Sequence, residues 1–397
     1  MDITVHPNKL RGSISAIASK SYAHRLLICS AFSDRETSLI CTERSLDIEA
    51  TASCLNALGA NISANSNGYH ISPIAAIPDS VTLPCGESGS TLRFLLPIVG
   101  ALGVDATFLM KGRLPDRPLH SLWEEMERMG CVLTRPTRES IRCCGKLSSG
   151  VFYIDGSISS QFISGLLFAG MLMEGTTTVQ CEKPVSFPYI QITKDVLQQF
   201  GIHVTNLTIA GKQHLRSPGE ITVEGDWSNS AFFLAANYLG SCIEVSNLNE
   251  HSTQGDRKIA DLLPILKNHC TISVAHIPDL VPILAVVASA NSGAVFTDTG
   301  RLRHKESDRL DAVAQMLRAL GGCVDIQQNA ISIRPGTLHG GTVNTFGDHR
   351  IAMAAAIAAT VADGPVRILD ADCVSKSYPG FWEDYKKLGG NYEQYIW

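Results

Sequence analysis

Residues 88–102 read SGSTLRFLLPIVGAL, a small polar start followed by a run that is apolar on nearly every side. Such a run is typical of a helix enclosed within a domain, because a helix at the surface keeps one polar face. A polar start and an Ala- or Leu-rich continuation recur in KSYAHRLLICSAF (20–32), SSQFISGLLFAGMLM (159–173), DWSNSAFFLAANYL (226–239), IPDLVPILAVVASA (277–290) and DHRIAMAAAIAATVA (348–362). The sequence therefore predicts six buried helices.

A second, amphipathic helix follows most of these runs and ends in an apolar residue followed by glycine, which fits a left-handed C-cap. The interval from the start of the buried run to this cap is 42 positions in the pairs Ser88 to Gly130, Ser159 to Gly201, Gly347 to Gly389 and, with asparagine in place of glycine, Asp226 to Asn268. With β-rich stretches around the helices, this recurrence indicates a strand-helix-strand-helix-strand-strand unit of about 70 residues used six times. A generic α/β protein with helices of coincidentally similar length is the alternative.

The length of 397 residues exceeds what one hydrophobic core usually serves, so we expect two domains with three units each. The net charge of -5 argues against a nucleic-acid surface, which needs an excess of Lys and Arg. No apolar stretch is long enough for a membrane span, and the first residues lack the apolar core of a secretion signal. The expectation is a cytoplasmic protein without nucleic-acid or membrane partners.

The 12 cysteines are mostly scattered singly through apolar segments, which fits reduced thiols in a core better than a disulfide framework. No Cys-x-x-Cys occurs, and no pair of histidines has metal-ligand spacing. The sequence therefore gives little support for a zinc site.

The polar starts of the six buried runs predict an anion-binding cleft. The first N–H groups of a helix and the positive end of its dipole attract anions, and Lys or Arg at the same place adds full charges. If the six helix starts face one cleft, they can bind two phosphorylated molecules.

Charged residues gather at several of these starts. SKSYAHR puts Lys20, Ser21 and Arg25 on the opening turns of one helix, and HIPD puts Asp279 at the head of another. An ordinary solvated helix start explains the first equally well, and N-capping explains the second. RLRHKESDRL brings Lys305 and Arg309 onto one helix face, although such density is usually a solvated face.

The motifs SKSYAHR, GESGSTLR, SSQF, HIPD, KESDRL, GDHR and SKSYPGF occur in the order and spacing of the enolpyruvylshikimate-phosphate synthase family, which the chain resembles over nearly its whole length. The resemblance implies an α/β fold of two inside-out, barrel-like domains, each with three βαβαββ repeats. The first domain would combine residues 1–18 and 226–397, and the second would span 19–225, with the active site in the cleft between them. It also favours a monomer.

The family transfers the enolpyruvyl group of phosphoenolpyruvate to the 5-hydroxyl of shikimate 3-phosphate in aromatic amino-acid biosynthesis, without a cofactor. The resemblance implies that phosphoenolpyruvate is bound by Lys20, Gly89, Arg117, Gln161, Arg309, His349, Arg350 and Lys376. It implies that shikimate 3-phosphate is bound by Lys20, Ser21, Arg25, Ser159, Ser160, Gln161, Ser186, Tyr189, Asp279 and Lys305. The implied catalytic residues are Lys20, Asp279 as the base for the 5-hydroxyl, and Glu306 as the group that protonates and later deprotonates the methylene carbon.

Three positions depart from the pattern of the family. Glu87 stands where many members have Asn, Phe94 where Pro often follows the arginine, and Arg301 where an Asn often contacts shikimate. Gly89 keeps the small residue that leaves room for the inhibitor glyphosate, so the resemblance implies sensitivity to it.

Two other functions are compatible with a cationic cleft on this fold. The sister enzyme that transfers enolpyruvate to UDP-N-acetylglucosamine usually carries a cysteine in the loop that reads MKGRLPDRPLH here, where none occurs. A noncatalytic phosphometabolite-binding regulator could lose its acid and base, whereas Asp279 and Glu306 are both present.

Overall fold

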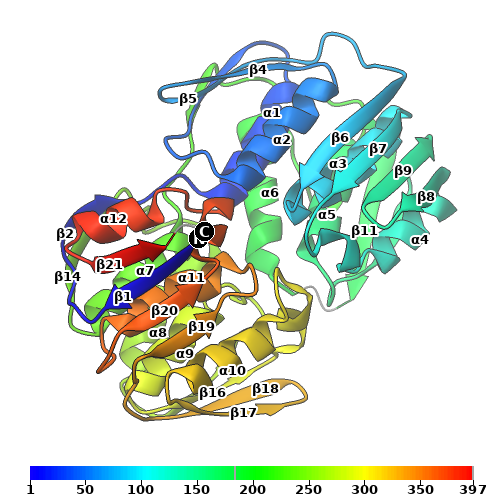
Figure 1. Cartoon of the computed structure of the whole chain (residues 1–397). Coiled ribbons are helices and arrows are strands. Elements are labelled where there is room, and N and C mark those ends of the chain that lie inside the picture. Colours follow the sequence, from blue (N-terminus) through cyan, green and yellow to red (C-terminus); the bar gives the residue numbers. More distant parts are fainter. Residues whose placement is uncertain (183–184, 396–397) are drawn as a thin grey trace. The chain divides into compact units, whose positions relative to one another are not determined.

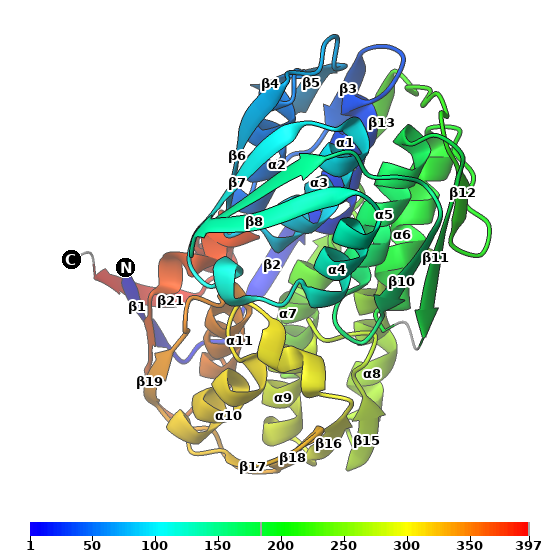
Figure 2. The same cartoon turned by 90° about the vertical axis from the view of Figure 1, so that its right-hand side faces the viewer.

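The computed structural model describes residues 1–182 and 185–395. The chain forms two compact units: unit 1 comprises Met1–Ser19 and Glu224–Trp397, and unit 2 comprises Lys20–Val223. Helices and strands alternate in both (Figures 1 and 2). The predicted α/β class is therefore confirmed.

Within its described residues, unit 2 contains three sheets. The first has the strand order β6-β7-β9-β8, formed by β6 (Ser80–Gly86), β7 (Asp105–Met110), β9 (Ser140–Gly145) and β8 (Cys131–Thr137). The second, β13-β3-β5-β4, is formed by β13 (Glu220–Thr222), β3 (Thr37–Ile40), β5 (Gly68–Ser72) and β4 (Asn61–Asn65). The third, β10-β11-β12, is formed by β10 (Val151–Asp155), β11 (Thr176–Glu182) and β12 (Thr208–Ala210). The α-helices of this unit are α1 (Lys20–Ala31), α2 (Leu46–Ala57), α3 (Gly89–Leu102), α4 (His120–Arg128), α5 (Ser160–Leu172) and α6 (Phe187–Gln199), with a short η1 (Leu114–Asp116).

The described part of unit 1 also contains three sheets. The first has the strand order β15-β16-β18-β17, formed by β15 (Cys270–Ser273), β16 (Ala294–Thr297), β18 (Ala330–Arg334) and β17 (Cys323–Gln327). The second, β19-β20-β1-β21, is formed by β19 (Gly341–Asn344), β20 (Val366–Leu369), β1 (Asp2–His6) and β21 (Asn391–Tyr395). The third, β14-β2, is formed by β14 (Cys242–Ser246) and β2 (Arg11–Ser15). The α-helices are α7 (Trp227–Tyr238), α8 (Ile259–Ile265), α9 (Val281–Ala290), α10 (Arg309–Ala319), α11 (His349–Ala359) and α12 (Phe381–Lys387). Three short 3-10 helices, η2 (Gly255–Lys258), η3 (Gly300–His304) and η4 (Ala371–Lys376), complete the described elements.

The six described sheets share one feature, which agrees with the strand-helix-strand start of the predicted repeat. Each contains a parallel pair, namely β6 with β7, β13 with β3, β10 with β11, β15 with β16, β19 with β20, and β2 with β14. The repeats differ in completeness, since the β10-β11-β12 and β14-β2 sheets have fewer than four strands in the described chain. The first strand of the chain completes a sheet begun near its end, because β1 lies between β20 and β21 (Figure 1).

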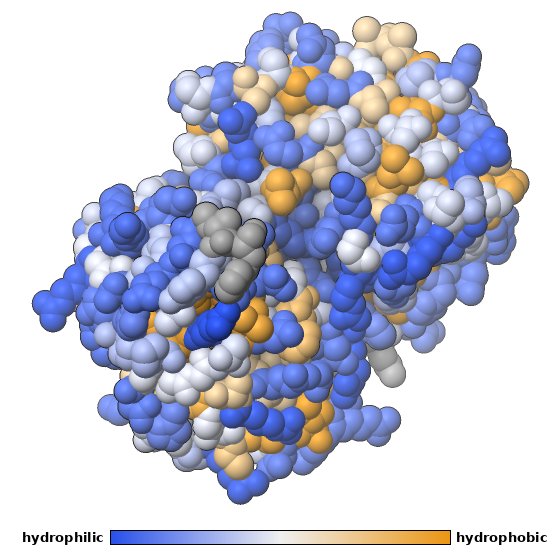
Figure 3. Space-filling model, in the orientation of Figure 1, coloured by the Kyte–Doolittle hydropathy of each residue, from blue (hydrophilic) through white to orange (hydrophobic). Residues whose placement is uncertain are grey.

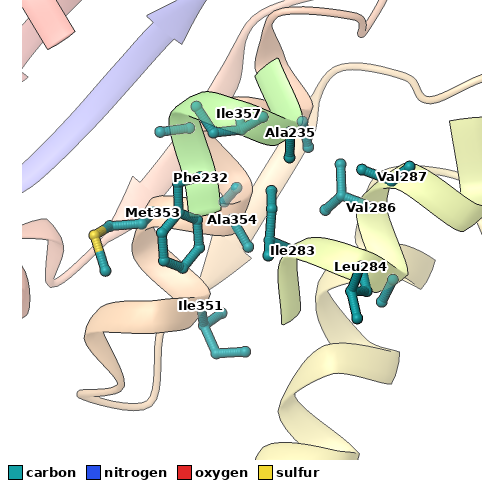
Figure 4. Packing of buried hydrophobic residues seen from close by; sticks show 14 of the residues in the cluster. Phe232, Ala235, Ile283, Leu284, Val286, Val287, Ile351, Met353, Ala354 and Ile357 are labelled. Carbon is teal, nitrogen blue, oxygen red and sulfur yellow. The ribbon is translucent and has the colours of Figure 1, made fainter. Parts of the chain in front are cut away.

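The six apolar runs form α1, α3, α5, α7, α9 and α11, and their side chains are almost all buried. In unit 1, residues of α7, α9 and α11 such as Phe232, Ile283 and Ala354 point toward one another (Figure 4). The face drawn in Figure 3 is mostly hydrophilic, with scattered hydrophobic residues. These helices therefore bury their apolar side chains inside the units.

The starts of the buried helices and the ends of the amphipathic helices α2, α4, α6, α10 and α12 follow the expected chemistry. Ser88, the N-cap of α3, accepts a hydrogen bond from the Thr91 N–H, and Asp226 caps α7 in the same way through Asn229. The predicted glycine caps adopt positive φ, which glycine tolerates without strain: Gly59, Gly130, Gly201, Gly321 and Gly389.

We predict that Leu284→Ala lowers the free energy of unfolding of unit 1 by about 2–5 kcal/mol, because it removes a fully buried side chain of α9 and leaves a cavity. Urea denaturation followed by circular dichroism measures the effect. The matched control is Ile265→Ala, which truncates a side chain that is 48% exposed and should change the value by less than about 0.5 kcal/mol. Equal effects of the two substitutions would contradict the described core.

Candidate active site

A fully buried arginine at the start of α10 connects three carboxylates of unit 1. The guanidinium of Arg309 donates from Nη1 to Asp279 Oδ1 at 2.6 Å and from Nη2 to Glu306 Oε2 at 2.5 Å. Its Nε donates to Asp348 Oδ2 at 2.9 Å, and Ser307 donates to the same oxygen at 3.0 Å. Because the Arg309 side chain is 0% exposed, these bonds compensate a charge that has left water entirely.

Asp279 lies just before α9, where capping was one interpretation of its position. The N-cap of α9 is Leu280 instead. The Asp279 carboxylate pairs with Arg309, with Lys305 Nζ at 3.1 Å and with Arg350 Nη2 at 3.4 Å. Residues from the segment before α10, from the first turn of α10 and from the first turn of α11 therefore converge on this carboxylate.

These neighbours determine the protonation of the cluster. Burial alone would raise the pKa of Asp279, but Arg350, Lys305 and Arg309 hold it well below its usual range. Burial lowers the pKa of Lys305 to about 8, although the Asp279 charge opposes this effect. Asp279 is therefore ionised at neutral pH and accepts protons weakly while all three cations face it.

Asp256, in η2, is a buried acid that the sequence did not single out. Ser228, on the first turn of α7, donates a hydrogen bond to Asp256 Oδ2, while Oδ1 has no hydrogen-bond partner among the described residues. Burial, followed by the negative charge of Asp279, raises the pKa of Asp256 to about 7. Nothing in the pattern TQGDRKIADLL indicates this burial, because it depends on how η2 packs on α7.

The remaining predicted residues of unit 1 lie on α11 and η4. His349 begins α11 and is fully buried, with Nδ1 4.0 Å from Asp348 Oδ1. Lys376 ends η4, which packs against α11, and is also buried.

In unit 2, the start of α3 meets the start of α5 through polar side chains. Arg93 Nη1 donates to Gln161 Oε1 at 2.9 Å, and Gln161 Nε2 donates to Ser90 Oγ at 2.8 Å. A Cβ atom on Gly89 would lie only 2.6 Å from Arg117 Nη1 and 3.0 Å from Arg93 Nη1. Glycine at this position therefore lets two guanidinium groups approach the backbone at a helix N-terminus, where an anion would be stabilised.

Arg25, on α1, is buried among neutral oxygens. It donates from Nε to Thr193 Oγ1 at 2.7 Å, from Nη1 to the Ser21 carbonyl at 2.6 Å, and from Nη2 to the Tyr189 carbonyl at 3.0 Å. A longer bond of 3.4 Å joins Nη2 to Ser164 Oγ. Two of the predicted ligand contacts, Ser21 and Tyr189, thus lie directly against Arg25.

A buried chain of hydroxyl groups joins α1, α2 and α3. Thr91 donates its hydroxyl proton to Ser88 Oγ at 2.7 Å, so Thr51 must donate to Thr91 at 2.6 Å, and His24 Nδ1 must donate to Thr51 at 2.7 Å. Burial lowers the pKa of His24 to about 3, so the ring is neutral and protonated on Nδ1. The chain fixes the N-cap of α3, next to Gly89, relative to the helix that carries Lys20.

The other predicted residues of unit 2 lie at helix starts. Lys20 opens α1 and pairs with Asp47 of α2 at 2.8 Å. Ser159 caps α5 by accepting from the Gln161 N–H, and Ser160 is the first residue of that helix. Ser186 occupies the N-cap of α6 with a left-handed backbone at φ 53°.

The three departures from the expected pattern have defined places. The Glu87 carboxylate lies over Gly112, with Oε1 2.2 Å from where a Cβ atom would stand. The central carbon of the Arg25 guanidinium lies over the ring of Phe94. Arg301 lies in η3, and its charge helps to lower the pKa of Lys305.

Sequence reasoning missed four residues that support the site: Asp47, Arg93, Asp256 and Asp348. Asp348 and Arg93 stood within the quoted motifs GDHR and GESGSTLR, so their spacing was available as a signal. Asp47 lacks such a signal, because only folding brings it to Lys20.

A profile of EPSP synthase (3-phosphoshikimate 1-carboxyvinyltransferase) matches residues 5–385. The chain belongs to this family. A 3-phosphoshikimate 1-carboxyvinyltransferase of Clostridium kluyveri is 36% identical over 420 residues, covering 99% of this chain and 98% of the relative. The Clostridium perfringens (strain ATCC 13124) protein of the same name is 37% identical, covering 98% of each chain.

Solved structures agree on the fold of this EPSP synthase family member. The EPSP synthase of Acinetobacter baumannii superposes with a TM-score of 0.81 at 22% identity, covering 99% of both chains. An enolpyruvyl transferase of Streptomyces tendae gives a TM-score of 0.78 at 16% identity, covering 99% of this chain and 98% of its own.

Two further properties concern the described residues only. They contain no group of three or more His, Cys, Asp or Glu side chains placed to hold a metal ion. Among them, no helix has the length and apolar character needed to cross a membrane.

The raised pKa of Asp256 predicts a pH-dependent stability. An unfolded aspartate titrates near pKa 3.9, whereas folding raises the pKa of Asp256 to about 7. Between these values the folded protein holds an additional proton, so this residue makes the free energy of unfolding fall as pH rises toward about 7 and adds no further change above it. Asp256→Asn keeps an acceptor for Ser228 but cannot ionise, so its stability relative to wild type should grow across this interval.

Urea denaturation at several pH values measures this difference. Asp261→Asn, which alters an exposed acid of α8, is the control and should retain the wild-type pH dependence. A constant difference between Asp256→Asn and wild type at every pH would contradict the assignment.

Proposed function

We propose that the protein transfers the enolpyruvyl group of phosphoenolpyruvate to the 5-hydroxyl of shikimate 3-phosphate and releases phosphate. Family membership over residues 5–385 supports the reaction. The observation that carries the proposal is the Asp279 carboxylate, held ionised by Lys305, Arg309 and Arg350. It supports the proposal because a carboxylate that could act as the base lies beside cations of the kind that two anionic substrates require.

In the proposed mechanism, the 5-hydroxyl oxygen attacks C2 of phosphoenolpyruvate while its proton passes to Asp279. Glu306 gives a proton to the methylene carbon, which produces a tetrahedral adduct. Removal of a proton from that carbon by Glu306 then restores the double bond as the C2–O bond to phosphate breaks, and the proton taken by Asp279 leaves with the phosphate. Lys20, at the start of α1, would stabilise the negative charge that develops during these steps.

The binding residues inferred from the family are proposed with the same roles. Phosphoenolpyruvate would contact Gly89, Arg117, Gln161, Arg309, His349, Arg350 and Lys376, together with Lys20. Shikimate 3-phosphate would contact Ser21, Arg25, Ser159, Ser160, Ser186, Tyr189 and Lys305, together with Lys20, Gln161 and Asp279. The boundaries of the compact units, after Ser19 and after Val223, support the proposed domains of 1–18 plus 226–397 and 19–225. We further propose a cytoplasmic monomer.

The reaction is tested by measuring phosphate release from phosphoenolpyruvate with either shikimate 3-phosphate or UDP-N-acetylglucosamine. We expect turnover only with shikimate 3-phosphate. Asp279→Ala and the isosteric Asp279→Asn should each lower kcat by about 10²–10⁴, the usual contribution of a general base. Asp325→Ala, which removes an exposed acid paired with Arg334, should leave kcat unchanged. Turnover of the sugar nucleotide alone, or full activity of both Asp279 variants, would overturn the proposal.

We predict that Gly89→Ala raises the KM for phosphoenolpyruvate by about ten-fold, because the added methyl group displaces Arg117 Nη1 from a position only 2.6 Å away. The KM for shikimate 3-phosphate should change little. Glyphosate should inhibit the wild type and inhibit this variant more weakly. Gly336→Ala is the control, since a Cβ atom there meets nothing within 4 Å. An unchanged KM for phosphoenolpyruvate would contradict the proposed role of Gly89.

A further inference from the structure

Arg25 is a buried cation that no carboxylate compensates. Its side chain is among the largest that are fully buried, and the oxygens that accept its protons belong to hydroxyl and carbonyl groups. In the described chain, no Asp or Glu forms a salt bridge with it, in contrast to Arg309 in unit 1. A buried charge with only neutral partners is costly, so other groups must stabilise it.

The ring of Phe94 supplies part of this stabilisation. The central carbon of the Arg25 guanidinium lies 4.8 Å from the ring centroid of Phe94, which is 0% exposed. A desolvated cation over an aromatic face gains electrostatic energy, and the flat ring also limits the planes that the guanidinium can adopt. Phe94 also makes T-shaped contacts with Phe168 of α5 and with His24.

The hydrogen bonds leave Arg25 one proton for a ligand. A guanidinium has five N–H groups. Its recorded bonds use Nε, both Nη2 protons and one Nη1 proton, and the bonded Nη1 proton points to the Ser21 carbonyl. The plane of the guanidinium therefore determines the direction of the remaining Nη1 proton, and the ring face of Phe94 helps to fix that plane.

We propose that Phe94 is a positioning residue for shikimate 3-phosphate, acting through Arg25: its ring face fixes the guanidinium plane in which Arg25 meets this substrate. The inference rests on the proposed function, which assigns Arg25 to shikimate 3-phosphate. Phe94 itself touches no substrate in this account. Its effect should therefore appear in the binding of one substrate and not in that of phosphoenolpyruvate.

The test measures the Kd of shikimate 3-phosphate by isothermal titration calorimetry and both KM values by steady-state kinetics. Phe94→Leu should raise the Kd and KM of shikimate 3-phosphate by about ten-fold, with kcat and the KM of phosphoenolpyruvate within about two-fold of wild type. Phe168→Leu is the matched control, because it removes a buried ring of the same cluster that contacts Phe94 edge-on. Phe168→Leu should lower the free energy of unfolding about as much as Phe94→Leu does, and it should leave the Kd of shikimate 3-phosphate unchanged.

A second measurement keeps the shape of the side chain. Replacing Phe94 with phenylalanines that carry one, two and three ring fluorines weakens the negative face stepwise while the packing changes little. The Kd of shikimate 3-phosphate should rise with each fluorine. A constant Kd across the series, or an equal loss in Phe168→Leu, would show that Phe94 only fills space and would overturn the inference.

Arg25→Lys separates this inference from the function on which it rests. If Arg25→Lys weakens shikimate 3-phosphate binding while the Phe94 variants do not, only the positioning role of Phe94 is wrong. If Arg25→Lys leaves the Kd unchanged, the proposed contact between Arg25 and this substrate is wrong, and the inference fails with it. Loss of the Phe94→Leu effect in the Arg25→Lys background would support the proposed coupling.

Discussion

A helix that is apolar on nearly every side must be enclosed, and this constraint organises both units. Enclosure leaves the N–H groups of the first turn without water, so each helix start needs acceptors or charges. Ser88 and Asp226 supply such acceptors for α3 and α7, and Ser159 and Asp348 do the same for α5 and α11. Polar groups are therefore required at the helix starts, while most of the remaining positions of these helices are apolar.

The two units stabilise their buried cations differently. In unit 1, Arg309 is surrounded by Asp279, Glu306 and Asp348. An incoming anion must replace one of these carboxylates or share the guanidinium with it. In unit 2, Arg25 has neutral partners and an aromatic face, so an anion would meet a charge that lacks a counter-ion. The first arrangement balances the buried cation with opposite charge, and the second leaves it to neutral oxygens and an aromatic ring.

The sequence predicted the repeat well because its signal is local. All-round apolar runs and the glycine caps can be read without knowledge of tertiary contacts, and the helices and the positive φ angles confirmed both. The short β14-β2 sheet was not predicted, because strand pairing depends on distant segments. The same reason explains why the burial of Asp256 against Ser228 was not predicted. Arg309 and Arg350 were predicted because the KESDRL and GDHR motifs carry the family resemblance.

The cations around Asp279 have opposite effects before and after substrate binding. In the structure, Arg350, Lys305 and Arg309 hold the pKa of Asp279 well below its usual range, which makes it a weak base. In the proposed function, the same three groups bind the substrates, whose phosphate and carboxylate charges would offset the cations and add negative charge near Asp279. Both changes raise the pKa of a carboxyl group. The residue would then gain strength as a base only when the substrates are in place, so that base catalysis and binding are coupled through shared cations.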